Sequence, residues 1–296
     1  MRAREIGSPK FVFVSAIVPN IEEINAWLGG MDDTVVRSDY RPALAEFAKL
    51  RADGRNANTT VALQFHPHLP ESTFSLDSFL SLDNFRFRNP STGRLKTHTF
   101  NSVKTQAIAA ARKALSMGPV AVFAANKRGN QGAVGLTKEL LSQLKLPLAM
   151  PTPGQYVKDE ATLLAAVEYF ILEYGVSWVG TRALEMGVVL HHGDIPQESR
   201  EVVEALVREE NVRLAICTST LAEGVNLPIR TLVLYSVQRR GADGATENLL
   251  ARDIKNLVGR AGRAGSTTKG LVICANPGQW PLVDPVARQQ PGERVS

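Results

Sequence analysis

Short apolar runs alternate with amphipathic segments over residues 101–275, and this alternation limits the possible folds more than any other feature of the sequence. Each run has four or five residues, which suits a strand buried on both faces and is too short for a helix. The runs lie at residues 120–124, 187–190, 214–217, 231–235 and 270–274. Because strands that alternate with helices build a parallel sheet covered by those helices, the sequence predicts a doubly wound α/β fold.

Two motifs rich in glycine and polar residues lie in the second half of this region. The first reads Cys-Thr-Ser-Thr-Leu-Ala-Glu-Gly-Val-Asn-Leu-Pro from Cys217, at the carboxyl end of a predicted strand, where ligands gather in open α/β sheets. The second covers residues 256–265 and holds Arg260 and Arg263 three positions apart, on one face of a helix or helical turn. Two planar, permanently charged groups suit phosphate oxygens and are typical of arginine fingers. A solvated basic turn is the alternative interpretation of either arginine alone.

The two motifs resemble motifs V and VI of superfamily-2 helicases, in the family's order and at a similar separation. They are most similar to the branch that contains exosome-associated RNA helicases and archaeal repair helicases. The resemblance implies that residues 101–276 form the second RecA-like lobe of a P-loop NTPase helicase. It also implies ATP with Mg²⁺ as the cofactor and DNA or RNA, single-stranded and held through its backbone, as the partner.

The resemblance implies roles for individual residues. Arg260 and Arg263 are expected to be catalytic and to face the γ-phosphate of ATP. The residues expected near the nucleotide are Gly224, Asn226 and Gly259. The residues expected to hold the nucleic-acid strand are Asn126, Gly193, Thr218, Ser219 and Asn256. Ser15 and Ala16 match motif III, which couples the two lobes. The chain departs from the family pattern at Ile17, Asn226 and Asn256, where relatives usually carry Thr, Asp and Gln.

The rest of the chain divides into three parts around the predicted lobe. Residues 1–40 resemble a remnant of the first RecA-like lobe, with the strand and the helix of motif III. Residues 41–100 are expected to form the inter-lobe connection with an insertion, and residues 277–296 a flexible tail. Within the connection, Phe85-Arg86-Phe87-Arg88 indicates either an edge strand or an aromatic and basic strip that stacks on bases.

ATP hydrolysis in this family needs Gly-x-x-x-x-Gly-Lys-[Ser/Thr] for the phosphates and an acidic pair for Mg²⁺. The sequence holds no Gly-Lys dipeptide, and Asp159-Glu160 opens a predicted helix where a Mg²⁺-binding pair would end a strand. We therefore expect a second motor lobe, inactive until a first lobe supplies the missing motifs in cis or in trans. The alternatives are a non-catalytic nucleic-acid-binding or regulatory module with the same fold, and a fragment of a longer helicase gene.

Charge and composition agree with a nucleic-acid partner. The formal net charge is +5, and residues 239–269 carry seven basic against three acidic side chains. No apolar run is long enough to span a bilayer and no signal-like segment opens the chain, so we expect a cytoplasmic protein without a membrane partner. Cys217 and Cys274 lie in apolar runs, which indicates packed thiols. His191 and His192 point to opposite faces of a strand, so no metal site is expected.

Overall fold

The structure is a computed structural model that describes residues 21–27, 44–52, 58–220, 227–241, 244–261 and 269–289. The chain divides into two compact units, residues 40–290 and the two ends of the chain, 1–39 with 291–296. The described part of the smaller unit is helix α1 (Ile21–Trp27), which the sequence predicts over residues 21–28. The motif III residues Ser15 and Ala16 lie outside the described residues.

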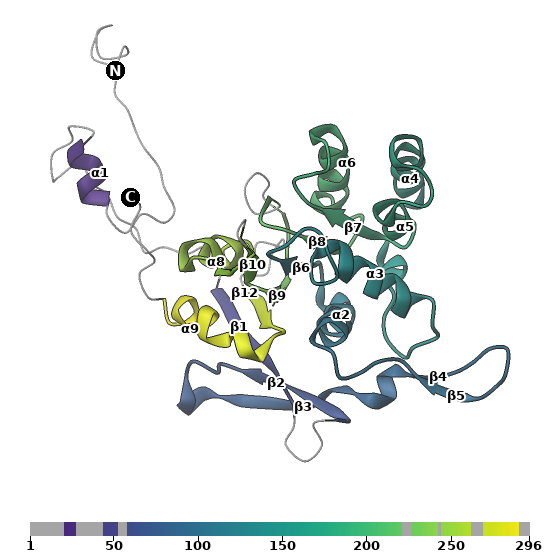
Figure 1. Cartoon of the computed structure of the whole chain (residues 1–296), viewed down its shortest axis with the longest axis horizontal. Helices are drawn as coiled ribbons and strands as arrows, with labels where there is room; N and C mark the ends of the chain where they lie inside the picture. Colours follow the sequence, from purple (N-terminus) through teal and green to yellow (C-terminus); the bar gives the residue numbers. More distant parts are fainter. Residues whose placement is uncertain are drawn as a thin grey trace, which may run out of the picture. The chain divides into compact units, whose positions relative to one another are not determined.

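The larger unit is built on an eight-stranded, mostly parallel sheet with the strand order β3-β2-β1-β12-β9-β6-β8-β7 (Figure 1). The six strands β1, β12, β9, β6, β8 and β7 run parallel to one another. Strands β2 and β3 are added antiparallel at the β1 edge. This arrangement confirms the predicted fold class. The strands of the sheet are β1 (Leu44–Ala52), β2 (Thr60–Phe65), β3 (Phe74–Ser81), β6 (Val120–Ala124), β7 (Val188–His191), β8 (Leu214–Cys217), β9 (Thr231–Ser236) and β12 (Lys269–Cys274).

Helices cover both faces of the sheet because its central strands are apolar on both faces. In β6, Val122 and Ala124 pack on one side, whereas Ala121 and Phe123 pack on the other, as alternating strand residues must. The first side is covered by α2 (Val103–Ala114) and α3 (Ala133–Leu144). The second side is covered by α4 (Glu160–Tyr174), α6 (Gln197–Arg208), α8 (Ala251–Val258) and α9 (Trp280–Ala287). The short helix α5 (Val179–Leu184) contributes to both sides, through Ala183 and Leu184.

The acidic pair at 159–160 forms a helix cap. Asp159 is the N-cap of α4, and its Oδ1 accepts hydrogen bonds from the backbone N–H groups of Ala161 at 2.9 Å and Thr162 at 3.2 Å. These bonds satisfy donors that the first turn of a helix leaves without a partner. The interpretation of this pair as a helix start is therefore confirmed.

The sequence pattern assigns residues 41–100 to the inter-lobe connection with an insertion. In the structure, the described part of this segment, residues 44–52 and 58–100, contributes strands to the main sheet. Strand β1 pairs in parallel with β12, and the β2–β3 hairpin extends the sheet beyond it. A separate hairpin joins β4 (Arg86–Arg88) to β5 (Leu95–Thr97). Phe85 is fully buried and packs edge-on against Phe100, with the ring centroids 5.2 Å apart. The Phe-Arg alternation is thus a short strand, and Phe85 belongs to the core.

The first part of the expected flexible tail is packed. Residues 277–279 form a 3-10 turn, and α9 follows it directly. Trp280 and Val283 are buried, so α9 seals the second side of the sheet next to α8. The buried side chains are spaced three residues apart, as on one face of a helix. The many prolines and glutamines of the segment made this pattern hard to recognise in the sequence. Residues 290–296 lie outside the described residues.

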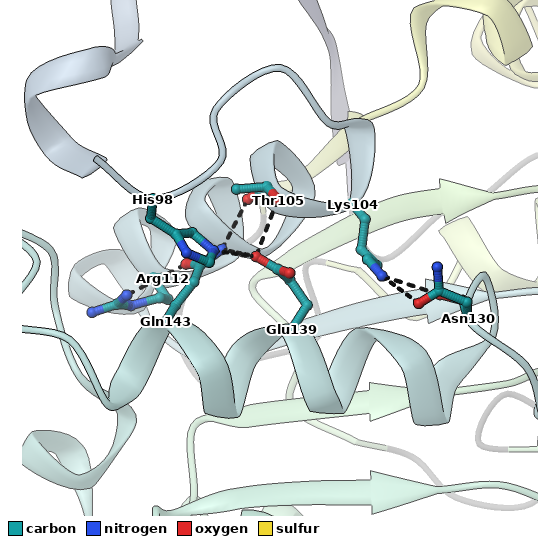
Figure 2. Close-up of polar contacts among 7 residues, drawn as sticks. All are labelled: His98, Lys104, Thr105, Arg112, Asn130, Glu139 and Gln143. Carbon is teal, nitrogen blue, oxygen red and sulfur yellow. Dashed lines mark hydrogen bonds and ion pairs between the residues drawn. The ribbon is translucent and has the colours of Figure 1, made fainter. Parts of the chain in front are cut away.

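A polar network connects the two helices of the first side (Figure 2). Glu139 on α3 accepts hydrogen bonds from Thr105 at 3.1 Å and from Gln143 at 3.0 Å, and it pairs with His98 at 2.9 Å. Burial alone raises the pKa of Glu139, but the hydrogen bonds from Gln143, His98 and Thr105 lower it by more, so the carboxyl stays ionised. The network fixes α2 against α3, the helix that begins directly after the loop that follows β6.

None of the helices in the described ranges is both long and apolar enough to cross a membrane.

Candidate functional site

The loops that follow β6 and β7 meet across the end of β8, because β8 lies between these two strands in the sheet. Asp194, just after β7, pairs with Lys127 Nζ at 2.5 Å and with Arg128 Nη2 at 2.7 Å, both just after β6. The hydrogen bond from Lys127, followed by the charges of both cations, holds the pKa of Asp194 below its ordinary value. We call residues 126–128, 192–194 and 218–220 the strand-end cluster.

A chain of hydrogen bonds connects the first residues of motif V to β7 and α6. The backbone N–H of Thr218 donates to the carbonyl of His191 at 3.2 Å, and the hydroxyls of Thr218 and Thr220 lie 3.2 Å apart. The ring of His191 is fully buried, 3.4 Å from Thr220 through Nδ1 and 2.7 Å from Glu204 through Nε2. Helix α6 therefore positions the threonines of motif V through a buried histidine, which argues for a structural role of His191.

The predicted strand-binding residues of β7 and β8 differ in their accessibility. Gly193 and Ser219 are exposed, while Thr218 is buried. A Cβ atom on residue 193 would lie 3.2 Å from Thr220 Cγ2, so glycine lets this turn pack closely on motif V. The exposed backbone of Gly193 and the hydroxyl of Ser219 are thus the groups here that a bound strand can reach. The Thr218 hydroxyl serves the internal chain of hydrogen bonds.

Asn126, another predicted strand-binding residue, uses its side chain inside the protein. Its Oδ1 accepts from the backbone N–H of Arg240 at 3.1 Å, and its Nδ2 donates to the carbonyl of Gln238 at 3.4 Å. These bonds tie the loop after β6 to β10 (Gln238–Arg240), which pairs with β11 (Thr246–Asn248). The neighbouring Lys127 and Arg128 have side chains that are 49% and 79% exposed and carry the positive charge outward.

Motif VI begins in the last turn of α8. The helix ends at Val258, Gly259 forms its C-cap, and the N–H of Arg260 donates to the carbonyl of Leu257 at 3.1 Å. Ala261 then forms a parallel bridge with Ile229, the residue that follows Leu-Pro at the end of motif V. Arg260 is half-buried, whereas Gly259 and Asn256 are exposed. The bridge brings the end of motif V and the start of motif VI together, which the sequence order alone does not require.

Three predicted nucleotide-site residues, Arg263, Gly224 and Asn226, lie outside the described residues, so no geometry is stated for them. Within the described part, the guanidinium group of Arg260 is of the kind that binds phosphate oxygens well. No cluster of three or more His, Cys, Asp or Glu side chains that could hold a metal ion occurs among the described residues.

Sequence reasoning missed two features of this site. It chose Asn126 from the loop after β6, although the two charged side chains that follow are the exposed ones. Charge directly after a buried strand was the signal for Lys127 and Arg128. It gave no role to Asp194, because nothing in the sequence indicates that two loops 67 residues apart share one carboxylate.

Residues 159–265 match the family described as the helicase conserved C-terminal domain. Together with the mostly parallel sheet, this match identifies a helicase C-terminal domain at residues 159–265. The resemblance predicted from motifs V and VI is confirmed.

Individual relatives agree with this assignment. The chain is similar to the Hachiman protein HamB of Bacillus cereus, with 26% identity over 288 residues that cover 95% of this chain and 24% of that protein. It is similar to the ATP-dependent DNA helicase Hel308 of Thermoplasma acidophilum, with 36% identity over 88 residues, or 30% of this chain and 13% of the helicase. It is also similar to the antiviral helicase SKI2 of Saccharomyces cerevisiae, with 34% identity over 90 residues, or 30% of this chain and 7% of that protein. The chain thus spans about a quarter or less of the length of these relatives.

Proposed function

We propose that this chain supplies the second motor lobe of an ATP-dependent nucleic-acid helicase. In this proposal the strand-end cluster holds the backbone of a single strand of DNA or RNA, and motif VI faces a nucleotide bound mainly by a first RecA-like lobe. The observation that carries the proposal is the convergence of the loops after β6, β7 and β8 at one sheet edge, joined by the ion pairs of Asp194.

The charge of the cluster supports a phosphate-bearing partner. Lys127 and Arg128 together exceed the single charge of Asp194 by one, and both cations are exposed. A carboxylate shared by two cations holds their side chains in place, which reduces the entropy lost when a phosphate binds. The exposed backbone of Gly193 adds room for close approach. Contacts of this kind read the backbone and not the base sequence.

The nucleotide side of the proposal rests on Arg260. In motor proteins an arginine from one lobe stabilises the charge of the γ-phosphate held by the other. The bridge between Ala261 and Ile229 and the bond from the Arg260 backbone to Leu257 position this residue at the end of α8. Mg²⁺ and most phosphate contacts would come from the first lobe, which carries the phosphate loop in this family.

Salt-dependent binding tests the nucleic-acid side. Fluorescence anisotropy with a labelled single strand should give an affinity that falls steeply between about 50 and 200 mM salt and is nearly independent of base sequence. The double variant Lys127→Gln with Arg128→Gln should bind more weakly and reduce the slope of log K against log salt by about 0.7 for each phosphate that it no longer neutralises. A charge-matched control, Lys138→Gln with Lys145→Gln, removes two exposed cations of α3 and its end and should leave the slope unchanged. Equal slopes for the two double variants would remove the strand-end cluster from the proposal.

ATP turnover tests the motor side. The chain alone should hydrolyse no ATP above background, with or without nucleic acid. Joined to a first lobe that carries the phosphate loop, it should gain stimulated turnover, and Arg260→Ala should lower that turnover by about 10³-fold or more. Arg260→Lys should not restore it, because a point charge does not replace the planar fork. Tight, salt-insensitive, sequence-selective binding without turnover in the joined protein would favour the non-catalytic binding module instead.

A further inference from the structure

A pocket of about 240 Å³ opens beside the strand-end cluster. Its apolar wall consists of Tyr174 at the end of α4, Trp178 before α5, Val134 on α3 and Ile195 after β7. Trp178 lies in the connection from α4 to α5 and Ile195 in the connection after β7, at the edge of the sheet where α4 and α5 lie (Figure 1). The volume lies just below the range of about 300–1,000 Å³ that is usual for whole small-molecule ligands. The pocket is therefore of a size for one ring system.

The aromatic side chains of this pocket are held in fixed positions. The rings of Tyr174 and Trp178 stack with centroids 4.5 Å apart and 27° between their planes. The Tyr174 hydroxyl donates to Ser199 Oγ at 2.7 Å, which anchors the outer ring to α6. A Cβ atom on residue 180 would lie 1.9 Å from Trp178 Cζ3, so the indole occupies space that only glycine leaves open. The ring stacking, the Ser199 hydrogen bond and the space at Gly180 thus fix the positions of both aromatic rings.

Charged groups complete the pocket on the side of the strand-end cluster. Arg128, His192 and Asp194 line it, and the ion pair of Arg128 with Asp194 lies at 2.7 Å. The N–H of Asp194 donates to His192 Nδ1 at 3.3 Å, which orients the imidazole. An apolar wall thus lies next to cations that suit phosphate and to acceptors that suit the N–H groups of a heterocycle. This combination matches a nucleotide unit: a flat ring attached to a phosphate.

We infer that this pocket accepts one unpaired nucleobase of the strand whose backbone contacts the strand-end cluster. The inference rests on the proposed function and deepens it, because it adds a base contact to a site otherwise built for phosphates. The base would lie against Tyr174 and Trp178, while its phosphate stays near Lys127 and Arg128. Aromatic walls of this kind are tolerant of base identity, since every base has an apolar ring face.

A strand with missing bases tests the inference. We would compare a single strand of about 12 nucleotides, within the range that single-stranded binding folds occupy, with a strand of equal length and charge that carries abasic positions. The full chain should bind the normal strand at least about 5-fold more tightly at equal salt. Oligo-dT and oligo-U strands should show the same preference, since the pocket recognises the ring and not the sugar.

Four variants separate the pocket from the backbone site. Trp178→Ala should abolish the preference for the normal strand, whereas Trp178→Phe should keep most of it. Gly180→Ala should also reduce the preference, because the added methyl group displaces the indole. Leu172→Ala removes an apolar side chain of α4 that is 84% exposed and lies outside the pocket, so it should change nothing. None of the four should change the salt slope, and thermal unfolding of each verifies that it folds.

A second readout does not depend on strand binding. The chain has three tryptophans, so the fluorescence difference between the wild type and Trp178→Phe isolates the signal of Trp178. Thymidine or uridine monophosphate should quench that signal, whereas ribose 5-phosphate should not. Equal binding of normal and abasic strands without quenching overturns the inference and leaves the proposed function intact. Quenching without any strand binding supports the pocket and overturns the proposed nucleic-acid site, and the absence of both overturns both.

Discussion

Arg112 provides the sharpest test of how the lobe is held together. Only 1% of this residue is exposed. Its Nε donates to the carbonyl of Pro151 at 2.9 Å, its Nη2 to that of Met150 at 3.0 Å, and its Nη1 to Gln143 Oε1 at 3.4 Å. Figure 2 shows the last of these bonds between α2 and α3. One planar side chain therefore joins both helices to the loop at 150–151.

The magnitude follows from two opposing effects. Burial lowers the pKa of Arg112 from its ordinary value to about 10, which corresponds to roughly 3 kcal/mol of desolvation cost. Hydrogen bonds from a charged group contribute about 1.5–3 kcal/mol each, so the two short bonds to carbonyls offset that cost and exceed it. Arg112→Met removes both effects, and its net cost should be about 1–3 kcal/mol of unfolding free energy.

Arg112→Lys distinguishes this explanation from simple loss of charge. Lysine keeps the desolvation cost, but its compact ammonium cannot span three acceptors that the planar fork reaches together. We therefore expect Arg112→Lys to lose about 2–4 kcal/mol, at least as much as Arg112→Met.

Urea unfolding followed by circular dichroism measures these differences, with the exposed Arg94→Met as the matched control. The control should stay within about 0.5 kcal/mol of the wild type, as surface substitutions usually do. If the Arg112→Lys variant is as stable as the wild type, the geometric argument is refuted, because charge alone then suffices.

Three further predictions concern single groups. Burial lowers the pKa of His192 below 6.5, although the charge of Asp194 opposes this shift. The neutral imidazole therefore stabilises the fold above about pH 6.5, and this stability is lost as the pH falls. His192→Gln should reduce the loss of unfolding free energy between about pH 7.5 and about pH 5.5, measured by urea unfolding, and an unchanged loss contradicts this. Asp159→Ala should lower the thermal stability through loss of the α4 cap, whereas Asp159→Asn should keep most of that stability. Equal losses for the two variants in calorimetry would show that the cap bonds are not the cause. Burial raises the pKa of the Cys217 and Cys274 thiols to about 12. A thiol reagent at pH 8 should therefore label neither cysteine in the folded chain and both in denaturant. Fast labelling of the folded chain would contradict the burial of these thiols.

The sequence alone determined the elements with strong local signals. The strands at 120–124 and 214–217 were predicted to the residue, because a short apolar run bounded by polar residues is typical of a strand buried on both faces. The cap at Asp159 followed from an acid that precedes a helical pattern. Motifs V and VI indicated a helicase lobe, which the family match confirms. These signals are local because each depends on residues that are close in the chain.

Only the tertiary structure decided which elements meet. Strand β1 lies next to β12, more than two hundred residues away, and no local pattern specifies that neighbour. The same holds for Asp194, whose ion-pair partner Lys127 lies 67 residues away in the chain. The sequence pattern at Phe85 favoured an edge strand over a base-stacking strip, and only burial against Phe100 placed Phe85 in the core. The physical reason is common to all three: long-range contacts depend on how the helices and strands pack and on the loop entropy that packing must offset, and neither is a property of any short stretch of sequence.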